Sequence, residues 1–482
     1  MITNNLVQKI WSFCDTLRDD GLGYNDYLEQ LTYLLFLKMA DENKNKYNLP
    51  DICNWGNLIK NTGGDLLDQY EKVLKTLGES GGMLENIFYG AQNKIHDSAK
   101  LKKLFILIGE EDWSSTGVDI KGQIYESLLQ KNAENSGAGQ YFTPRPVIQA
   151  MVNCLKPMPM ETIADPSCGT GGFFLGVLEY LEKNFTLNKN EKEALKFDTF
   201  HGWEIEKGTA RLCLMNLYLH GIGDLKKTPD IHITDSLKFG VDTKVKMVLA
   251  NPPFGKNSSD IPTTDEKLAG KEGYFLRNDF WITTSNKQLA FLQHIVAMLH
   301  EDGRAAVVLP DNVLFEGGAG EIIRKKLLEE VNLHTILRLP TGIFYAHGVK
   351  ANVLFFEKKK IKETDIEQFI WYYDYRTNIH HTPKKNPLKY ESLKDFVKCY
   401  NPDDRRKRVE TWSAENPDGR WRKFSFNEII ERDKCNLDIS WLKDDNDIDL
   451  SNLPNADDLL DEIIENMGNA LNNLLALKES LN

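Results

Sequence analysis

Hydrophobic and polar positions divide the 482-residue chain into a helical N-terminal part and a middle part in which short strands alternate with helices. In the first part, leucines from Leu28 to Leu37 lie close to helical spacing, and the segment from Gln123 to Lys131 repeats the pattern. Glycines at 21, 63–64 and 81–82 mark turns. No glycine-rich loop follows a strand here, so we expect a helical accessory domain.

In the middle part, short apolar runs alternate with helical patterns. The predicted strands cover residues 162–164, 200–203, 231–234, 247–250, 305–309, 335–339 and 352–356. The predicted helices cover residues 173–183, 207–220, 287–300 and 321–331. This alternation predicts an α/β fold with a doubly wound, mostly parallel, seven-stranded sheet. Ligands bind such sheets beyond the carboxyl ends of the strands.

Three other segments depart from this alternation. Residues 255–286 are polar with interspersed aromatics, and loops of this length are usually functional or disordered. Residues 358–425 are charged and contain a basic run from Arg405 to Arg408; such a run is most often a solvated face, with a phosphate contact as the alternative. Residues 455–480 form a broad apolar helical stripe, which suggests docking on another helix of this chain or of a partner.

Length and pattern together predict three domains. These are an N-terminal helical domain (residues 1–138), a catalytic α/β domain (residues 139–425) and a C-terminal helical extension (residues 426–482). The longest apolar run, residues 31–40, is too short to cross a bilayer, and no secretion signal is visible, so we expect no membrane contact. The seven cysteines include no Cys-x-x-Cys pair, so we predict no metal site and a reducing cytoplasm.

The net charge of the chain indicates how it can bind DNA. With 59 basic and 71 acidic residues, the net charge is −12. Tight DNA binding draws mainly on phosphate neutralisation by Lys and Arg, so this balance argues against autonomous DNA binding. A local basic groove or a partner subunit would still allow DNA as a substrate.

A glycine-rich segment follows the first predicted strand and reads Asp-Pro-Ser-Cys-Gly-Thr-Gly-Gly-Phe over residues 165–173. Glycines let a backbone approach a ligand closely, and the amides at a helix N-terminus suit the carboxylate of a methionine moiety. The spacing is not Gly-x-Gly-x-x-Gly and no phosphate-loop lysine is present, which disfavours a dinucleotide. The candidate S-adenosylmethionine contacts of this segment are Asp165, Ser167, Gly169, Thr170, Gly171 and Gly172.

Carboxylates also end the next two predicted strands. Glu204 is placed to accept both ribose hydroxyls of the cofactor, and Asp235 with Ser236 is placed to meet the adenine ring or its amino group. Any one of these carboxylates alone is more simply a helix cap or a surface ion pair. Three at successive strand ends favour a cofactor site.

The tetrapeptide Asn251-Pro252-Pro253-Phe254 follows the fourth predicted strand. An exocyclic amino nitrogen on adenine or cytosine is a poor nucleophile, because its lone pair is delocalised into the ring. The side-chain oxygen of Asn251 and the backbone carbonyl of Pro252 can accept the two amino hydrogens and direct the lone pair at the sulfonium methyl, while Phe254 offers a stacking face. Catalysis would then rest on positioning and electrostatics. A Pro-Pro turn after a strand is common, but its pairing with the upstream glycine-rich segment favours chemistry; Cys168 in that segment is interpreted as a packing residue.

With these residues in view, the chain resembles the modification (M) subunits of type I restriction-modification systems, which are N6-adenine DNA methyltransferases. Residues 137–145 look like the family segment that closes over the methionine end of the cofactor. The resemblance implies cofactor contacts from Gln140, Tyr141, Phe142, Thr143, Pro144 and Arg145. Residues 338–344 and 348–356 look like the late family motif, in which Phe344 takes the position of the second aromatic around a flipped base. Four motifs occur in family order over nearly the whole chain.

The resemblance implies partners as well. The family's M subunit works on double-stranded DNA as two copies with one specificity (S) subunit, which reads the DNA, and a restriction (R) nuclease subunit can join. The N-terminal domain is similar to the family's DNA-clamping and dimerising domain, and the C-terminal helix is similar to one that docks on the S subunit. The target adenine must leave the duplex, at roughly a few kcal/mol.

Two alternatives stay open at this point. Protein-glutamine and RNA-guanine methyltransferases use similar Asn-Pro-Pro-aromatic motifs, and a catalytically silent scaffold is the non-enzyme hypothesis. The helical accessory domain and residues 140–145 favour DNA, and the intact motif at residues 251–254 argues against a scaffold.

Overall fold

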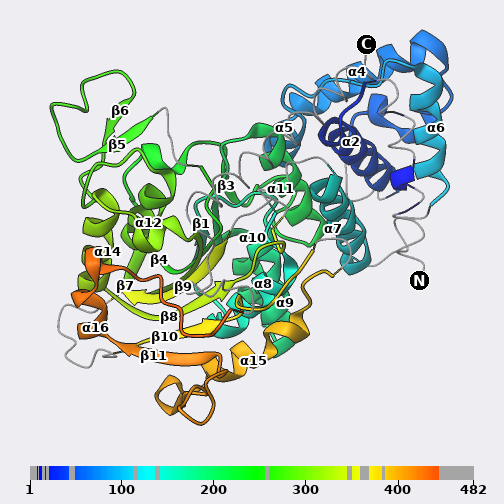
Figure 1. Ribbon diagram of the computed structural model, residues 1–482. Coiled ribbons are helices and arrows are strands. Elements are labelled where there is room, and N and C mark those ends of the chain that lie inside the picture. Colours follow the sequence, from blue (N-terminus) through cyan, green and yellow to red (C-terminus); the bar gives the residue numbers. More distant parts are fainter. Residues whose placement is uncertain are drawn as a thin grey trace, which may run out of the picture. The chain divides into compact units, whose positions relative to one another are not determined.

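A nine-stranded sheet is the framework of the protein, whose computed structural model is shown in Figure 1. The structure describes residues 8, 10–12, 17, 21–42, 49–111, 118–135, 142–255, 260–344, 350–358, 369–382 and 386–444. The strands of this sheet are β1 (Ile163–Asp165), β2 (Phe200–Trp203), β3 (Asp230–His232), β4 (Val245–Ala250), β7 (Leu299–Pro310), β8 (Val331–Leu339), β9 (Ala351–Lys358), β10 (Phe369–Asp374) and β11 (Trp421–Ser425).

The strand order is β11-β10-β8-β9-β7-β4-β1-β2-β3. Strand β9 runs antiparallel to β7 and β8, and β11 runs antiparallel to β10, whereas the other neighbours are parallel. The predicted doubly wound, mostly parallel sheet is confirmed, and all seven predicted strands are present. Two more strands, β10 and β11, extend the sheet beyond β8.

Helices cover both faces of the sheet. On one face, α8 (Arg145–Leu155), α9 (Gly172–Asn184) and α15 (Tyr390–Tyr400) share a continuous apolar core with the strands. On the other, α12 (Lys287–Met298) packs on β4 and β7, and α14 (Ala319–Glu330) packs on β8. The remaining helices of this part are α10 (Lys189–Phe197), α11 (Lys207–Leu219), α13 (Asn312–Phe315) and α16 (Phe426–Glu431), with short 3-10 turns η3 (Ser236–Lys238), η4 (Arg405–Lys407) and η5 (Asp433–Cys435).

The N-terminal part is helical, as its pattern predicts. Its elements are α2 (Tyr24–Glu42), η1 (Asp51–Cys53), α3 (Trp55–Leu58), α4 (Gly63–Gly78), α5 (Gly82–Phe88), α6 (Ser98–Gly109) and α7 (Val118–Asn135). Their core includes Leu214, Met215 and Leu219 of α11, so the helical part packs directly on a helix of the sheet domain. The described residues up to Ser440 belong to one compact unit.

The two polar segments carry more structure than their composition indicates. The first contains a small parallel pair, β5 (Ile261–Thr263) and β6 (Tyr274–Leu276). In the second, the expectation of a solvated face for the basic run is only half right. Arg405 binds Glu357 at 2.7 Å and Arg408 is buried over the Tyr400 ring, whereas the Arg406 and Lys407 side chains are exposed.

Some predictions fall outside the described residues. These are the contacts of Gln140 and Tyr141 and the amphipathic helix over residues 455–480. Among the described helices, none combines the length and apolarity needed to cross a membrane.

Candidate active site

The glycine-rich segment forms a tight turn between β1 and α9. Gly169 and Gly171 adopt positive φ values of 53° and 81°, which favour glycine. A Cβ atom on Gly171 would lie 3.1 Å from Cys213 Sγ and 3.2 Å from Leu217 Cδ2, both on α11. The turn therefore needs glycine for its backbone conformation and for its close packing on α11.

Two buried carboxylates line or border this turn. Asp165 Oδ1 accepts a hydrogen bond from the Ser167 amide at 3.0 Å, and Glu204 accepts from the amides of Gly169 (3.1 Å) and Glu206 (2.8 Å). Burial, reinforced by the charge of Glu204, raises the pKa of Asp165 from 3.8 to about 8. Burial also raises the pKa of Glu204. No cationic side chain among the described residues forms an ion pair with either carboxylate.

The end of β3 is tied to the same turn. Ser236 Oγ donates a hydrogen bond to the Pro166 carbonyl at 2.8 Å, and Asp235 caps η3 by accepting from the Leu237 amide at 3.0 Å. Successive strand ends therefore meet around the glycine-rich turn, as the motif spacing predicts. Asp235 is half-buried, and its observed contact is the capping one.

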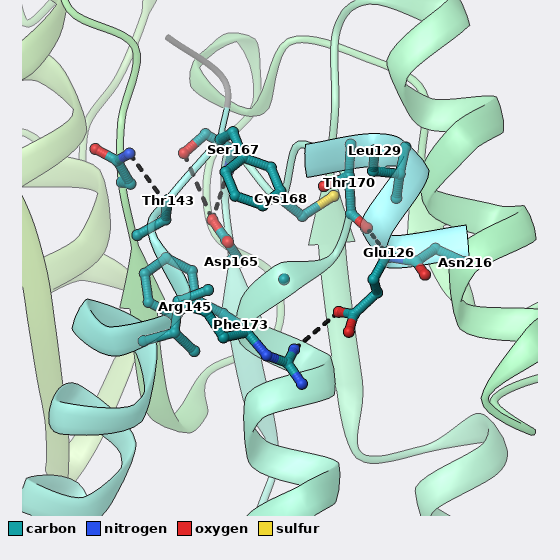
Figure 2. A pocket seen from close by; sticks show the side chains of 14 residues that line it. Glu126, Leu129, Thr143, Arg145, Asp165, Ser167, Cys168, Thr170, Phe173 and Asn216 are labelled. Carbon is teal, nitrogen blue, oxygen red and sulfur yellow. Dashed lines mark hydrogen bonds and ion pairs between the residues drawn. The ribbon is translucent and has the colours of Figure 1, made fainter. Parts of the chain in front are cut away.

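Figure 2 shows the pocket that opens beside the turn, with the Asp165 carboxylate pointing into it. Its lining residues that the sequence predicted are Phe142, Thr143, Arg145, Asp165, Ser167, Thr170, Gly172 and Asn251. Glu204, Asp235 and Ser236 are not in this lining; they border it through the turn. The guanidinium of Arg145 is engaged by Glu126 at 2.8 Å and by Glu179, so in this structure its partners are acidic side chains of the chain itself.

Six residues line the pocket that were not predicted to contact the cofactor or the base. Glu126, Leu129, Ile148 and Asn216 lie outside the recognised motifs, whereas Cys168, interpreted from the sequence as a packing residue, and Phe173 lie within the 165–173 motif. Asn216 is a buried polar residue on the otherwise mainly apolar helix α11. Its Nδ2 donates a hydrogen bond to the Thr170 carbonyl at 2.9 Å, and no described residue donates to its Oδ1. A polar residue within the apolar run Leu214–Leu219 was the available signal. Glu126 and Leu129 come from α7, a contribution no local pattern could reveal.

Asn251 lies at the carboxyl end of β4, at the edge of the same pocket. Its Nδ2 donates to Thr143 Oγ1 at 3.0 Å. Its Oδ1 is buried, and no donor reaches it among the described residues. A buried oxygen without a donor costs about 1–3 kcal/mol, so this acceptor is available to a donor that the described residues do not supply.

The two predicted stacking residues are in contact. The rings of Phe254 and Phe344 lie edge to face, with centroids 5.9 Å apart and an interplanar angle of 80°. Phe344 is buried and Phe254 half-buried. The structure therefore brings together residues from the end of β4 and from the turn after β8, and a planar base could stack between the two rings only if they moved apart.

The residues present fit S-adenosylmethionine. The turn brings backbone and small side chains to the pocket wall, and the two buried carboxylates without ion pairs among the described residues suit a ligand that carries a sulfonium and an ammonium charge. Glu204 keeps lone pairs for hydroxyl donors beyond the two amides that it already accepts.

Comparison with known proteins gives a consistent result. The family model described as N-6 DNA methylase matches residues 116–447, and the HsdM N-terminal domain model matches residues 6–108. The chain is 39% identical to the type I restriction enzyme EcoKI methylase subunit of Escherichia coli K12, covering 100% of this chain and 96% of that one. It is 38% identical, with the same coverage, to the StySJI methylase subunit of Salmonella typhimurium.

Solved structures of type I restriction-modification proteins are also similar to this chain. The crystal structure of the EcoKI M protein is similar with a TM-score of 0.55 and 35% identity, covering 99% of this chain and 96% of that chain. A chain from a type I restriction-modification system matches with a TM-score of 0.73 and 25% identity, covering 99% and 98%. The chain therefore belongs to the N-6 DNA methylase family and, within it, to the methylase subunits of type I restriction enzymes.

Proposed function

We propose that the pocket at the carboxyl ends of β1 and β4, bordered by the end of β2, is where this adenine-specific DNA methyltransferase binds S-adenosylmethionine and receives the target base. The observation that carries the proposal is the Asn251 side chain. Its Nδ2 donates a hydrogen bond to Thr143 Oγ1 at 3.0 Å. Its Oδ1 is buried, and none of the described residues donates a hydrogen bond to it.

The amino group of adenine is such a donor. Asn251 Oδ1 and the Pro252 carbonyl accept its two hydrogens, which favours a pyramidal nitrogen with its lone pair aimed at the methyl group. The hydrogen bond from Asn251 to Thr143 fixes the orientation of the amide, so this acceptor needs no reorganisation during the reaction. Phe254 and Phe344 stack on the flipped base once their rings part.

The cofactor supplies an electrophilic methyl group on a sulfonium. The backbone of residues 169–172 at the start of α9 holds the methionine part, together with Phe142 to Arg145 and Ser167. Glu204 accepts the ribose hydroxyls, and Asp235 with Ser236 contacts the adenine. The carboxylates of Asp165 and Glu204 attract the cationic centres of the cofactor. The positive charge of the cofactor in turn lowers the free-energy cost of keeping both buried carboxylates ionised.

DNA recognition needs further chains. The relatives are named methylase subunits of type I restriction enzymes, and this chain spans nearly their full length. We propose an assembly of two copies with one specificity subunit on double-stranded DNA, to which a restriction subunit can be added. The net charge of −12 supports this, because most of the phosphate neutralisation must then come from a partner.

The substitution Asn251→Ala tests the proposal. Removing the preorganised acceptor should lower the rate of DNA methylation on the order of a hundredfold or more, while cofactor affinity measured by calorimetry persists. Asn332→Ala is the matched control, because Asn332 on β8 also has a buried Oδ1 without a donor among the described residues but lies outside the pocket lining. Methylation by Asn251→Ala at the rate of the control would remove Asn251 from the chemistry.

A further inference from the structure

The aromatic side chain that is proposed to stack on the base, Phe344, sits on a turn that is braced by a segment outside the recognised motifs. This segment, residues 374–382, follows β10, which is one of the two strands that the sequence did not predict. Gly342 in the Phe344 turn has a φ of 80°, and a Cβ atom there would overlap the His381 carbonyl oxygen. The two backbones are therefore packed against each other without room for a side chain.

Arg376 is the centre of this brace. Its Nε donates to the Leu339 carbonyl at 3.0 Å, at the end of β8, and its Nη2 donates to the Ala351 carbonyl at 3.0 Å, at the start of β9. These two atoms flank the turn that carries Phe344. Nη1 and Nη2 of Arg376 donate to Oδ2 and Oδ1 of Asp311, at 2.8 and 2.7 Å, and Asp311 directly follows β7.

Asp311 connects this brace to the part of the sheet that carries Asn251. It follows β7, which is the parallel neighbour of β4, and Asn251 follows β4 in the same direction. Asn352 Nδ2 donates a further hydrogen bond to Asp311 at 2.7 Å. One guanidinium thus joins the ends of β7, β8, β9 and β10, which lie next to one another in the sheet (Figure 1).

The Arg376 side chain is itself held in place. Buried Asp374 accepts hydrogen bonds from the backbone amides of Arg376 and Thr377, each at 2.8 Å, and from Thr377 Oγ1 at 2.9 Å. The Arg376 and Asp311 side chains are only 12% and 19% exposed, so solvent screens their bidentate pair weakly. A planar fork fits this geometry, and an ammonium group would not reproduce it.

We propose that Arg376 is a positioning residue for base capture, which fixes the turn of Phe344 relative to Asn251. It acts through the backbone at residues 339 and 351 and through Asp311, and it does not itself touch the base. The inference rests on the proposed stacking role of Phe344.

Arg376→Lys tests this in the full chain assembled with its specificity subunit. The measured quantities are kcat, the cofactor dissociation constant, and the fluorescence rise of a duplex that carries 2-aminopurine at the methylated position. Misplacing the turn should lower kcat on the order of tenfold to a hundredfold and remove most of the fluorescence rise, with cofactor affinity unchanged.

Arg304→Lys is the matched control. Arg304 is similarly shielded at 17% exposure and makes a similar fork to Glu161 with carbonyl contacts to Leu155 and Lys156, but it lies in the middle of β7, away from the strand ends that carry the site. Its substitution should lower the melting temperature comparably and leave kcat within about twofold, as expected for a site remote from the chemistry. Equal loss of kcat in both variants, or full kcat and fluorescence in Arg376→Lys, would overturn the inference.

Two further variants keep the outcome decisive. If Arg376→Lys does not fold, the same results are expected of Asp311→Asn, which keeps the size of the side chain and one acceptor oxygen. Failure of both variants to fold would mean a purely structural role and would also overturn the inference.

Phe344→Ala separates this inference from the proposed function. If Phe344→Ala keeps the fluorescence rise, the stacking assignment is wrong; if it loses the rise while Arg376→Lys retains it, only the positioning role is wrong.

Discussion

Cofactor binding should release a proton from Asp165. In the free protein, burial and the nearby charge of Glu204 hold the pKa of Asp165 at about 8. The sulfonium and ammonium groups of S-adenosylmethionine would bring positive charge close to this carboxylate and favour its ionised form. Binding and deprotonation are then linked, and affinity depends on pH.

The size of the effect follows from the pKa. At pH 7, a carboxyl with a pKa of about 8 is about nine-tenths protonated, so binding should release close to one proton if the bound cofactor returns the pKa toward its ordinary value. Apparent affinity should rise by up to about tenfold per pH unit below pH 8 and level off above it.

The stability of the free protein should change in the opposite direction. Because the pKa of Asp165 in the folded state is raised above its unfolded value of 3.8, its contribution to stability is fully present below about pH 4 and is lost as pH rises through 8. The loss is on the order of 5 kcal/mol for a shift of this size. Asp165→Asn keeps the acceptor for the Ser167 amide and removes the charge, so it should raise the melting temperature of the free protein at pH 8.

Calorimetric titration with S-adenosylmethionine at pH 7, in buffers of different ionisation enthalpy, counts the protons released. The wild type should release close to one, and Asp165→Asn should release almost none and show a flatter pH dependence of affinity. A wild-type count near zero at pH 7, or an equal count in Asp165→Asn, would refute the assignment of the proton to this carboxylate.

Three other substitutions test separate parts of the account. Gly171→Ala should lower the free energy of unfolding by about 1–3 kcal/mol, because φ is positive there and the new Cβ would crowd Cys213; an unchanged denaturant midpoint would contradict this. Glu204→Gln should weaken cofactor binding about tenfold in calorimetry, because a charged acceptor for the ribose hydroxyls is lost, and equal affinity would remove Glu204 from the site. Arg211→Met should lower the free energy of unfolding on the order of 3 kcal/mol by weakening the contact between α11 and α2. The substitution removes the ion pair to Glu29 and the hydrogen bonds to Tyr33 Oη (2.6 Å) and to the Tyr89 carbonyl (2.8 Å). Urea unfolding identical to that of the wild type would argue against this.

The strands and motif positions could be predicted because their information is local. Most predicted strands are short and mainly apolar, and the motifs at residues 165–173, 204, 235 and 251–254 lie at or shortly after strand ends. In a parallel sheet those ends share one edge, so the order of motifs along the chain was enough to bring them together.

The parts that were missed depend on contacts between distant segments. Strand β10 is rich in aromatic residues but lies within a charged stretch, and β11, at the edge of the sheet, has two consecutive basic residues between its two aromatic residues, so composition concealed both. The pocket wall from α7 and the hydrogen bonds of Arg376 depend on tertiary packing, since Glu126 and Arg145 are 19 residues apart and Arg376 and Asp311 are 65 residues apart. The basic run misled for the same reason, because Arg405 finds its partner Glu357 on a neighbouring strand.

Methylation of adenine N6 in DNA from the pocket beside Asn251 can be measured directly. The full chain, its specificity subunit and unmethylated DNA are incubated with S-adenosylmethionine carrying a labelled methyl group, and the labelled nucleoside is identified by mass spectrometry. We expect label in N6-methyladenine from the wild type and from Asn332→Ala, and almost none from Asn251→Ala. Label in another nucleoside, in RNA or in protein, or label in N6-methyladenine at wild-type rate from Asn251→Ala, would contradict this expectation.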